Sequence, residues 1–327
     1  MSSWGGASVL ITGGTGSFGK AFVRRLLDDG VAGRIVIFSR DELKQYEVRQ
    51  TLGEDPRLRW MIGDVRDKDR LRRAMTGIDY VVHAAALKQV DTAEYNPFEA
   101  VKTNVLGSQN VIDVAVDVGV RRVVALSTDK ASSPINLYGA TKLCADKLFI
   151  AGNHYAGAAE TRFSVVRYGN VVGSRGSVVP FFKRLAAEGV TRLPITDARM
   201  TRFWITLPQA VQFVLDAFER MTGGELFVPR IPSMKITDLA QVLVPGSEIE
   251  VIGIRPGEKL HEEMISAEDA QRTVRFPDHY VVKPVFSEWG GSHLEGGDPV
   301  PDDFMYRSDL NDQWLSHAEL AAMVAQI

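Results

Sequence analysis

The stretch ASVLITGGTGSFGKAFVRRLLDDG, residues 7–30, joins an apolar run to a glycine-rich loop and an amphipathic segment. The apolar run predicts a buried strand, and the segment after the loop predicts a helix that ends on a glycine. Glycines at this point allow a tight turn and let the backbone approach a pyrophosphate at the helix N-terminus. We interpret the loop as a dinucleotide-binding loop, with cofactor contacts from Gly13, Thr15, Gly16, Ser17, Phe18 and Gly19.

The alternation of strand and helix continues along the N-terminal half of the chain. Apolar runs and amphipathic segments alternate: strands are predicted at 34–39, 58–64, 79–86 and 121–128, and helices at 41–52, 68–75 and 97–119. Such alternation predicts a parallel sheet with helices on both faces, and ligands bind such sheets at the carboxyl ends of the strands. We therefore expect an α/β fold with a Rossmann-type, doubly wound parallel sheet.

The pattern loosens in the C-terminal half. Shorter elements follow there, with helices predicted at 183–189 and 207–221 and strands at 192–196, 224–229 and 249–254. We expect a dinucleotide-binding Rossmann domain at residues 1–168. Residues 169–327 are expected to form mainly a smaller substrate-binding lobe, from which some later segments rejoin the sheet.

Composition and charge are typical of a soluble enzyme. Hydrophobic residues make up 45% of the 327 residues, and the net charge of −3 argues against a nucleic-acid partner. The single cysteine, Cys144, fits a reducing compartment, and we expect it to be a buried, inert thiol. No run approaches the ~20 apolar residues of a membrane span, and no basic region precedes the first apolar run. We expect a cytoplasmic protein without a membrane partner or a metal site, since HEEMI at His261 lacks a second histidine.

The end of the second predicted strand bears on the choice between NAD and NADP. It reads IFSRDELK, where Ser39, Arg40 and Lys44 could bind a 2′-phosphate. Asp41 is the kind of residue that meets the 2′-hydroxyl of NAD, but it is also suited to cap the following helix. We therefore predict NADP. Further cofactor contacts are expected after the third and fourth strands, from Asp64, Val65, Ala84, Ala85 and Ala86.

A reactive pair is predicted in STDKASSPINLYGATK, residues 127–142. Tyr138 and Lys142 are four residues apart, so they share one face of a helix. A free tyrosine has a pKa of ~10, and a nearby ammonium and a cationic nicotinamide would favour its phenolate form. Tyr138 could then take a hydroxyl proton while hydride leaves the same carbon, with Thr128 holding that hydroxyl in line.

Several motifs resemble those of extended short-chain dehydrogenases/reductases that act on nucleotide sugars, over essentially the whole chain. They are ITGGTGSFG, HAAALKQVD, NLYGATK, RYGNVVGSRGSVVPFF, MTRFWIT and RPGEKLHEEMI. The motifs look like those of the inverting UDP-N-acetylglucosamine 4,6-dehydratases of pseudaminic-acid biosynthesis. The resemblance implies a lyase that acts on UDP-N-acetylglucosamine and works as a homo-oligomer, either a dimer or a hexamer.

The resemblance also implies roles for Asp129 and Lys130. In dehydratases similar to the dTDP-glucose enzyme, an Asp-Glu pair stands here; the acid expels the C6 hydroxyl and the Glu removes the C5 proton. In this chain a lysine replaces the Glu, as in the inverting enzymes, and Tyr138 stands where C5-retaining relatives have methionine. Lys130 is thus implied as the C5 base and Asp129 as the acid. The implied product, after hydride returns to C6, is UDP-2-acetamido-2,6-dideoxy-β-L-arabino-hexos-4-ulose.

Later motifs supply groups suited to a nucleotide sugar. Arg202 and Arg255 are donors for phosphate, and Glu258 could accept from ribose hydroxyls. The resemblance adds four further substrate positions, of which the last two are expected under the uracil: Lys88, Asn170, Val178 and Pro180.

Other functions remain open on the sequence. A C5-retaining UDP-sugar 4,6-dehydratase or a nucleotide-sugar 4-epimerase would use the same tyrosine and lysine. The epimerase would not need the acid–base pair at positions 129 and 130. A non-catalytic NADP-binding sensor would need only the fold, but such proteins usually lose the tyrosine or the lysine, and this chain has both.

Overall fold

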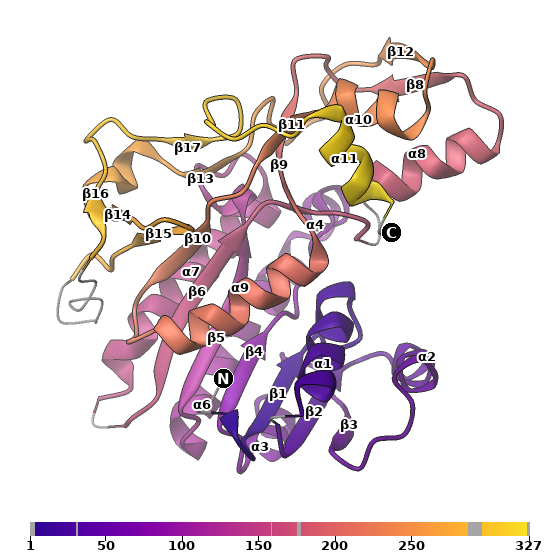
Figure 1. Ribbon diagram of the computed structural model, residues 1–327. Helices are drawn as coiled ribbons and strands as arrows, with labels where there is room; N and C mark the ends of the chain where they lie inside the picture. The colour runs from indigo at the N-terminus through magenta and orange to yellow at the C-terminus, as the bar shows by residue number, and fades with distance from the viewer. Residues whose placement is uncertain (1–3, 31, 158, 175–177, 287–295, 326–327) are drawn as a thin grey trace.

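A ten-stranded sheet runs through the centre of the molecule (Figure 1). The computed structural model describes residues 4–30, 32–157, 159–174, 178–286 and 296–325. Part of the sheet is parallel, in the order β10-β6-β5-β4-β1-β2-β3. These strands are β1 (Ser8–Thr12), β2 (Arg34–Ser39), β3 (Leu58–Ile62), β4 (Tyr80–His83), β5 (Arg122–Thr128), β6 (Arg162–Tyr168) and β10 (Leu226–Pro229).

The strand order reverses beside β1. Strands β2 and β3 are added on one side of β1, whereas β4, β5 and β6 are added on the other. At such a switch point the loops after the two central strands diverge and leave a crevice at the carboxyl ends of the strands. The predicted doubly wound α/β fold is therefore confirmed, and the crevice lies where the predicted glycine loop leaves β1.

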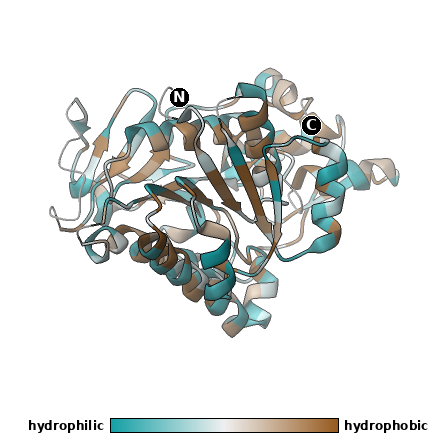
Figure 2. Ribbon diagram, turned by 90° about the horizontal axis from the view of Figure 1, so that it is seen from below, coloured by the Kyte–Doolittle hydropathy of each residue, from teal (hydrophilic) through white to brown (hydrophobic). Residues whose placement is uncertain are grey.

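Helices cover both faces of the sheet (Figure 1). On one face α1 packs against α9, and on the other α6 packs against both α3 and α7. The side chains of Phe22, Val23 and Leu26 in α1 are fully buried, and each such burial contributes roughly 1.5–3 kcal/mol. Figure 2 shows the resulting apolar interior along the strands. The helices are α1 (Ser17–Asp29), α2 (Glu42–Leu52), α3 (Lys68–Met75), α6 (Gly107–Val118), α7 (Leu137–Tyr155) and α9 (Leu207–Arg220). None of the helices that the structure describes is long and apolar enough to cross a bilayer.

The C-terminal part of the chain contributes both to a second core and to the main sheet. Strands β15 (His279–Val282), β14 (Thr273–Arg275) and β16 (Asp298–Pro299) continue the sheet beyond β10 in antiparallel pairing. A separate apolar cluster includes Phe182 and Trp204. Its surroundings comprise β7 (Asn170–Val171), α8 (Val178–Ala187), β8 (Arg192–Ile195), β9 (Thr201–Ile205), β11 (Ser233–Lys235), α10 (Ile236–Leu243), β12 (Glu248–Val251) and α11 (His317–Val324). The strand pair β13 (Glu263–Ile265) and β17 (Tyr306–Arg307) contributes Met264, Ile265 and Tyr306 to the core of the main sheet.

The helix predicted at 97–119 is interrupted. It consists of α5 (Pro97–Ala100), a π-helical segment (Val101–Leu106) and α6, and a short α4 (Val90–Tyr95) precedes it. The π-helical segment holds the buried side chain of Asn104, whose Oδ1 accepts from Leu87 N at 2.8 Å and whose Nδ2 donates to Leu87 O at 2.9 Å. A π turn has no hydrophobic period of its own, so the sequence pattern did not indicate it.

The expectation for Cys144 was wrong, because its side chain is exposed on α7. The buried residues of this helix include Thr141, Lys142, Ala145 and Asp146. Successive residues of a helix point in directions about 100° apart, so Cys144 points to solvent although the next residue, Ala145, is buried.

Candidate active site

A pocket of about 780 Å³ opens at the carboxyl ends of the parallel strands. It is lined by the loops that follow β1 to β6 and by part of the segment 255–262 from the C-terminal half. The structure brings nearly every predicted site residue to this pocket: Gly13, Thr15, Gly16, Ser17, Phe18, Gly19, Ser39, Arg40, Lys44, Asp64, Val65, Ala84, Ala85, Ala86, Lys88, Thr128, Asp129, Lys130, Tyr138, Lys142, Asn170, Arg202, Arg255 and Glu258.

Two predicted residues do not line the pocket. Val178 and Pro180 belong to the first turn of α8. There Val178 packs against the apolar core of the C-terminal lobe, and Pro180 is exposed. The amphipathic character of α8 thus directs this turn toward the second core.

The glycine loop fits a dinucleotide. Gly13 has a φ of +67°, and a Cβ there would lie 2.9 Å from Ala85 N. A Cβ on Gly19 would lie 2.5 Å from Gly14 Cα, so a side chain would break the contact between the loop and α1. Gly16 is the N-cap of α1 and offers no side-chain cap, which leaves the first N–H groups of the helix to face an anion.

The end of β2 is arranged by local ion pairs. Asp41 caps α2, as interpreted from the sequence: its Oδ1 accepts from Lys44 N at 3.0 Å. Lys44 Nζ lies 3.0 Å from Asp41 Oδ2, and Arg40 Nη1 lies 3.6 Å from Asp64 Oδ2. Both cationic side chains are half exposed and line the pocket, so they are accessible to a bound anion.

Helix α7 carries Tyr138 and Lys142 into the pocket, on one face as predicted. Asn136 starts the helix by accepting a hydrogen bond from Gly139 N at 2.7 Å. Lys142 Nζ donates to Leu126 O at 2.6 Å, and burial lowers the pKa of this lysine. Burial also raises the pKa of Tyr138 to about 12. The protein's own charges therefore leave Tyr138 protonated, and the cationic nicotinamide that the sequence-based expectation also invoked is needed to favour the phenolate.

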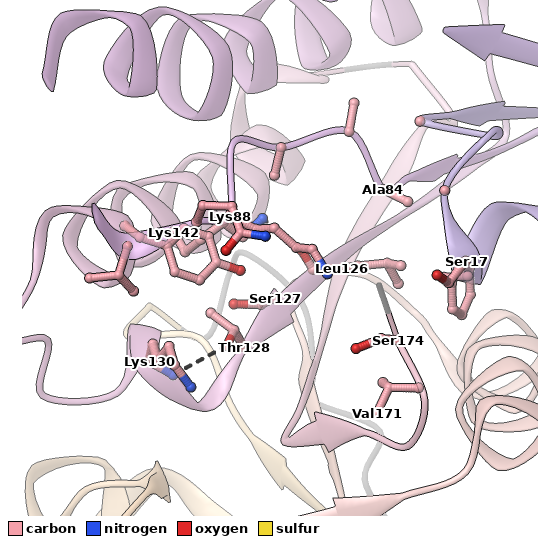
Figure 3. A pocket seen from close by; sticks show the side chains of 18 of the residues that line it. Ser17, Ala84, Lys88, Leu126, Ser127, Thr128, Lys130, Lys142, Val171 and Ser174 are labelled. Atoms are coloured by element: carbon pink, nitrogen blue, oxygen red, sulfur yellow. Dashed lines mark hydrogen bonds between the residues drawn. The ribbon is translucent and has the colours of Figure 1, made fainter. Parts of the chain in front are cut away.

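Asp129 and Lys130 form a three-membered cluster with Glu262. Lys130 Nζ lies 3.1 Å from Asp129 Oδ1 and 2.9 Å from Glu262 Oε1. The two carboxylate side chains are each 2% exposed, whereas Lys130 is 25% exposed toward the pocket. Thr128 Oγ1 donates to Asp129 Oδ1 at 2.9 Å. Figure 3 shows Thr128, Lys130 and Lys142 on the side of the pocket opposite Ser17.

The three groups of this cluster have divergent acidities. Burial, and then the Glu262 carboxylate, raise the pKa of Asp129. Burial alone would lower the pKa of Lys130, but Asp129 and Glu262 outweigh it and raise that pKa. Burial alone would raise the pKa of Glu262, but Lys130 and Arg202 outweigh it and lower that pKa. The lysine is thus held as an ammonium, and of the two carboxyl groups Asp129 takes up a proton first.

The segment around Glu262 is bound by hydrogen bonds to the loop that follows β5. Asn136 Nδ2 donates to Gly257 O at 2.7 Å, and Lys259 Nζ donates to Ser132 O at 2.6 Å. These bonds hold a part of the C-terminal half against the loop that follows β5.

Arg202 is engaged within the protein. Its guanidinium is 7% exposed, and Nη1 and Nη2 donate to the carbonyl oxygens of Leu260 and Lys259 at 3.1 Å each. Arg202 Nε also lies 3.6 Å from Glu262 Oε1. Arg255, by contrast, is exposed at the pocket rim. Of the two arginines, Arg255 is the one with a guanidinium open to a diphosphate.

The sequence did not indicate Glu262. It lies 132 residues after Lys130, and no local spacing links the two positions. The pattern that could have drawn attention to it is the acidic pair in LHEEMI, within one of the motifs that carry the family resemblance.

Comparisons with known proteins identify the family of this chain. Residues 9–284 match the family of polysaccharide biosynthesis proteins. The chain is 56% identical over 326 residues to the UDP-N-acetylglucosamine 4,6-dehydratase (inverting) of Campylobacter jejuni, a match that covers 98% of this chain and 97% of the relative. It is 45% identical over 280 residues to the UDP-glucose 4-epimerase of Rickettsia rickettsii, covering 84% and 82%.

Two solved structures are similar over most of the chain. Pen from Bacillus thuringiensis has a TM-score of 0.91 and 38% identity, covering 99% of this chain and 98% of its own. DesIV, a dTDP-glucose 4,6-dehydratase from Streptomyces venezuelae with NAD and TYD bound, has a TM-score of 0.68 and 26% identity, covering 77% and 86%.

Proposed function

Because the chain belongs to the family of polysaccharide biosynthesis proteins, we propose that it is a C5-inverting UDP-N-acetylglucosamine 4,6-dehydratase. The observation that carries the proposal is the convergence of Asp129, Lys130 and Tyr138 in one pocket with the glycine loop. The 56% identity to an inverting dehydratase supports both the substrate and the stereochemistry. The product is UDP-2-acetamido-2,6-dideoxy-β-L-arabino-hexos-4-ulose.

The first step is oxidation at C4. The glycine loop would hold a nicotinamide dinucleotide, which when bound would supply an acceptor for the C4 hydride and a donor of hydride to C6. Tyr138 takes the proton of the C4 hydroxyl, and Thr128 orients that hydroxyl. The raised pKa of Tyr138 makes this transfer dependent on the positive charge of the bound oxidised cofactor, with Lys142 supporting the phenolate.

The second step is loss of water across C5 and C6. The C4 ketone acidifies the C5–H bond. Lys130 receives the C5 proton, while Asp129, whose pKa is raised, gives its proton to the departing C6 hydroxyl. The bound cofactor would return hydride to C6, and a solvent proton that enters at C5 on the face opposite Lys130 would invert that centre.

We further propose that the cofactor is NADP. Arg40 and Lys44, both half exposed in the pocket, would contact the 2′-phosphate, with Ser39 nearby. The capping role of Asp41 supports this, because its carboxylate is already engaged with Lys44.

For the substrate, Arg255 is proposed to contact the diphosphate, and Glu258 the uridine ribose. Lys88 and Asn170, which also line the pocket, would meet the sugar. Arg202 would contribute by holding the segment that carries Glu258, since its own donors are engaged within the protein.

The family also supports a cytoplasmic homo-oligomer in pseudaminic-acid biosynthesis as part of the proposal. Exposed apolar side chains along α4, α5 and the π-helical segment support self-association, namely Tyr95, Phe98 and Leu106. Light scattering after size-exclusion chromatography would measure the number of subunits directly.

The proposed function is tested by proton NMR of the protein with UDP-N-acetylglucosamine and NADP in deuterated water. We expect a 4-keto-6-deoxy sugar with deuterium at C5 and the L-arabino configuration in the earliest product. An earliest product of D-xylo configuration would identify a retaining dehydratase instead.

A second candidate is a 4-epimerase, favoured by the 45% identity to a protein of that name. In the same NMR experiment, an epimerase would give a C4 epimer that keeps its C6 hydroxyl and takes up no deuterium at C5. This outcome would reject the dehydratase.

A further inference from the structure

We infer that Glu262 is a positioning residue of the proposed dehydration: it receives the proton that Lys130 must lose before Lys130 can take the one on C5. The inference rests on the proposed function and deepens it. Lys130 Nζ lies within 3.1 Å of two carboxylates, and an ammonium held in this way has no lone pair with which to accept a proton.

The two carboxylates are not equivalent. Asp129 follows β5 directly and receives a hydrogen bond from Thr128, whereas Glu262 arrives from the C-terminal half with Arg202 Nε at 3.6 Å. Arg202 favours the ionised form of Glu262, and Glu262 in turn favours the protonated form of Asp129. The surroundings therefore push the pKa values of the two carboxyl groups apart. Two such groups can serve in one reaction, the protonated one, Asp129, as the acid and the ionised one, Glu262, as the base.

The position of Glu262 is fixed by the main chain. Its N–H donates to Ser308 Oγ at 3.0 Å, and its carbonyl oxygen accepts from Ser308 N at 2.8 Å. Ser308 is fully buried, as is Glu262 Oε2, which has no hydrogen-bond partner among the residues described. Glu262 Oε1 is therefore held at 2.9 Å from Lys130 Nζ, within proton-transfer distance.

The proton transfers then balance. The ammonium of Lys130 gives a proton to Glu262 Oε1, and the freed amine takes the proton from C5. The electrons of the C5–H bond form the C5–C6 double bond as the C6–O bond breaks, and Asp129 gives its proton to the leaving hydroxyl to form water. Lys130 then returns a proton to Asp129 at 3.1 Å and recovers one from Glu262 at 2.9 Å, which restores the starting state of the cluster. Solvent supplies the proton that C5 takes up, and Tyr138 releases the C4 hydroxyl proton to solvent, so no net proton is gained or lost.

The test uses Glu262→Gln in the full-length protein. Glutamine keeps the size of the side chain and an oxygen for Lys130 but cannot accept a proton. We expect cofactor reduction on mixing with UDP-N-acetylglucosamine to stay close to wild type, because C4 oxidation does not use Glu262. Deuterium entry at C5 and loss of water should fall by roughly 10²–10⁴-fold. Glu262→Asp, which keeps a carboxylate, should recover part of both rates.

The matched control is Glu263→Gln. Glu263 is the next residue, lies outside the pocket and accepts hydrogen bonds from Ser132 and Ser133 at 2.8 and 2.7 Å. We expect its replacement to leave the ratio of dehydration to cofactor reduction unchanged. An equal loss of cofactor reduction and dehydration in Glu262→Gln would mean that Glu262 only maintains the fold, and unchanged rates would mean that it has no role. Either result overturns the inference, as does a Glu262→Asp variant no better than Glu262→Gln.

The pH profile gives an independent readout. Asp129 must be protonated to act as the acid, so activity is lost as the pH rises through its pKa. Glu262 and Lys130 face Asp129, and Arg202 and Lys259 face Glu262. Removing the Glu262 charge lowers the pKa of Asp129, so the alkaline limb of Glu262→Gln should move to lower pH. An unmoved limb would contradict the inference. A wild-type protein that forms no keto sugar would instead refute the proposed function itself.

Discussion

At the scale of single residues, the proposed chemistry depends on Lys130 and its two carboxylate neighbours. Replacing Lys130 with methionine removes the proposed C5 base but keeps most of the unbranched side chain. We expect Lys130→Met to lower C5 deuterium exchange and dehydration by roughly 10²–10⁴-fold. Cofactor binding should persist, since Lys130 lies across the pocket from Ser17 of the glycine loop (Figure 3). NMR in deuterated water and cofactor titration measure the two effects.

Lys147→Met serves as the control for this variant, because Lys147 is an exposed lysine of α7 and does not line the pocket. Near wild-type turnover of Lys130→Met would show that another group is the C5 base.

The choice of cofactor is also decided by single residues. Arg40→Ala removes a proposed charge-assisted contact to the 2′-phosphate, which is worth roughly 1.5–3 kcal/mol, or a 10- to 150-fold rise in the Kd for NADP. The Kd for NAD should change little. Calorimetric titration with both cofactors makes the comparison, and Arg73→Ala, at an exposed arginine of α3, is the control. An equal loss for both cofactors would argue against a 2′-phosphate site.

The sequence predicted residues of the site well wherever they are close to a strand end. Thr128, Asp129 and Lys130 follow β5 directly, and the period of a helix placed Tyr138 and Lys142 on one face. Glu262 reaches the cluster only because the C-terminal half folds back onto the loop after β5, through bonds such as Lys259 Nζ to Ser132 O. Contacts of this range depend on tertiary packing, and no local pattern encodes them.

At the scale of elements, the glycine loop and α1 act as one unit. A Cβ on Gly19 would lie 2.5 Å from Gly14 Cα, so Gly19→Ala must push the loop away from the helix. We expect cofactor binding to become undetectable by calorimetry. Gly30→Ala, at the other end of α1, is the matched control: its φ of +67° makes alanine cost about 1–2 kcal/mol of stability, but no atom lies within 4 Å of the added Cβ. Intact cofactor binding by Gly19→Ala would show that the loop is not a tight cradle.

Elements with a clear hydrophobic period were predicted well, and the elements between them less so. The strands from β1 to β5 and the helix α1 follow their patterns closely. The π-helical segment and the short helix α4 were missed, and in the π-helical segment Asn104 pairs with the backbone of Leu87, a contact that no local pattern indicates. Val178 and Pro180, predicted to lie under the uracil, are in the first turn of α8, where Val178 packs against the second core and Pro180 is exposed.

At the scale of the whole molecule, stability should depend on a histidine in the central strand β4. His83 is fully buried, with Nδ1 at 2.9 Å from Thr12 Oγ1, and burial, with a smaller effect of Lys142, lowers its pKa to about 3. Below about pH 6.5 the unfolded chain binds a proton that the native protein does not bind until about pH 3. The free energy of unfolding should therefore fall as the pH is lowered through this range.

Urea denaturation at several pH values measures this dependence. His83→Asn has no titratable group at this position, so its stability should fall less steeply than that of the wild type. His154→Asn, at an exposed histidine of α7, should keep the wild-type slope. Equal slopes for the wild type and His83→Asn would contradict the prediction.

The pairing of β10 with β6 determines where the chain can be truncated or exchanged without exposing a strand edge. Val165 and Val166 of β6 pair with Leu226 and Phe227, so a fragment that ends after β6 would expose an apolar strand edge of the kind that recruits other chains. A preparation of the N-terminal half would aggregate rather than bind dinucleotide as a free module. A chimera made with a homologue should accordingly exchange only the segment between β6 and β10. The strands β6, β10 and β15 should then all come from the same parent, so that each keeps the neighbour it pairs with in the native sheet.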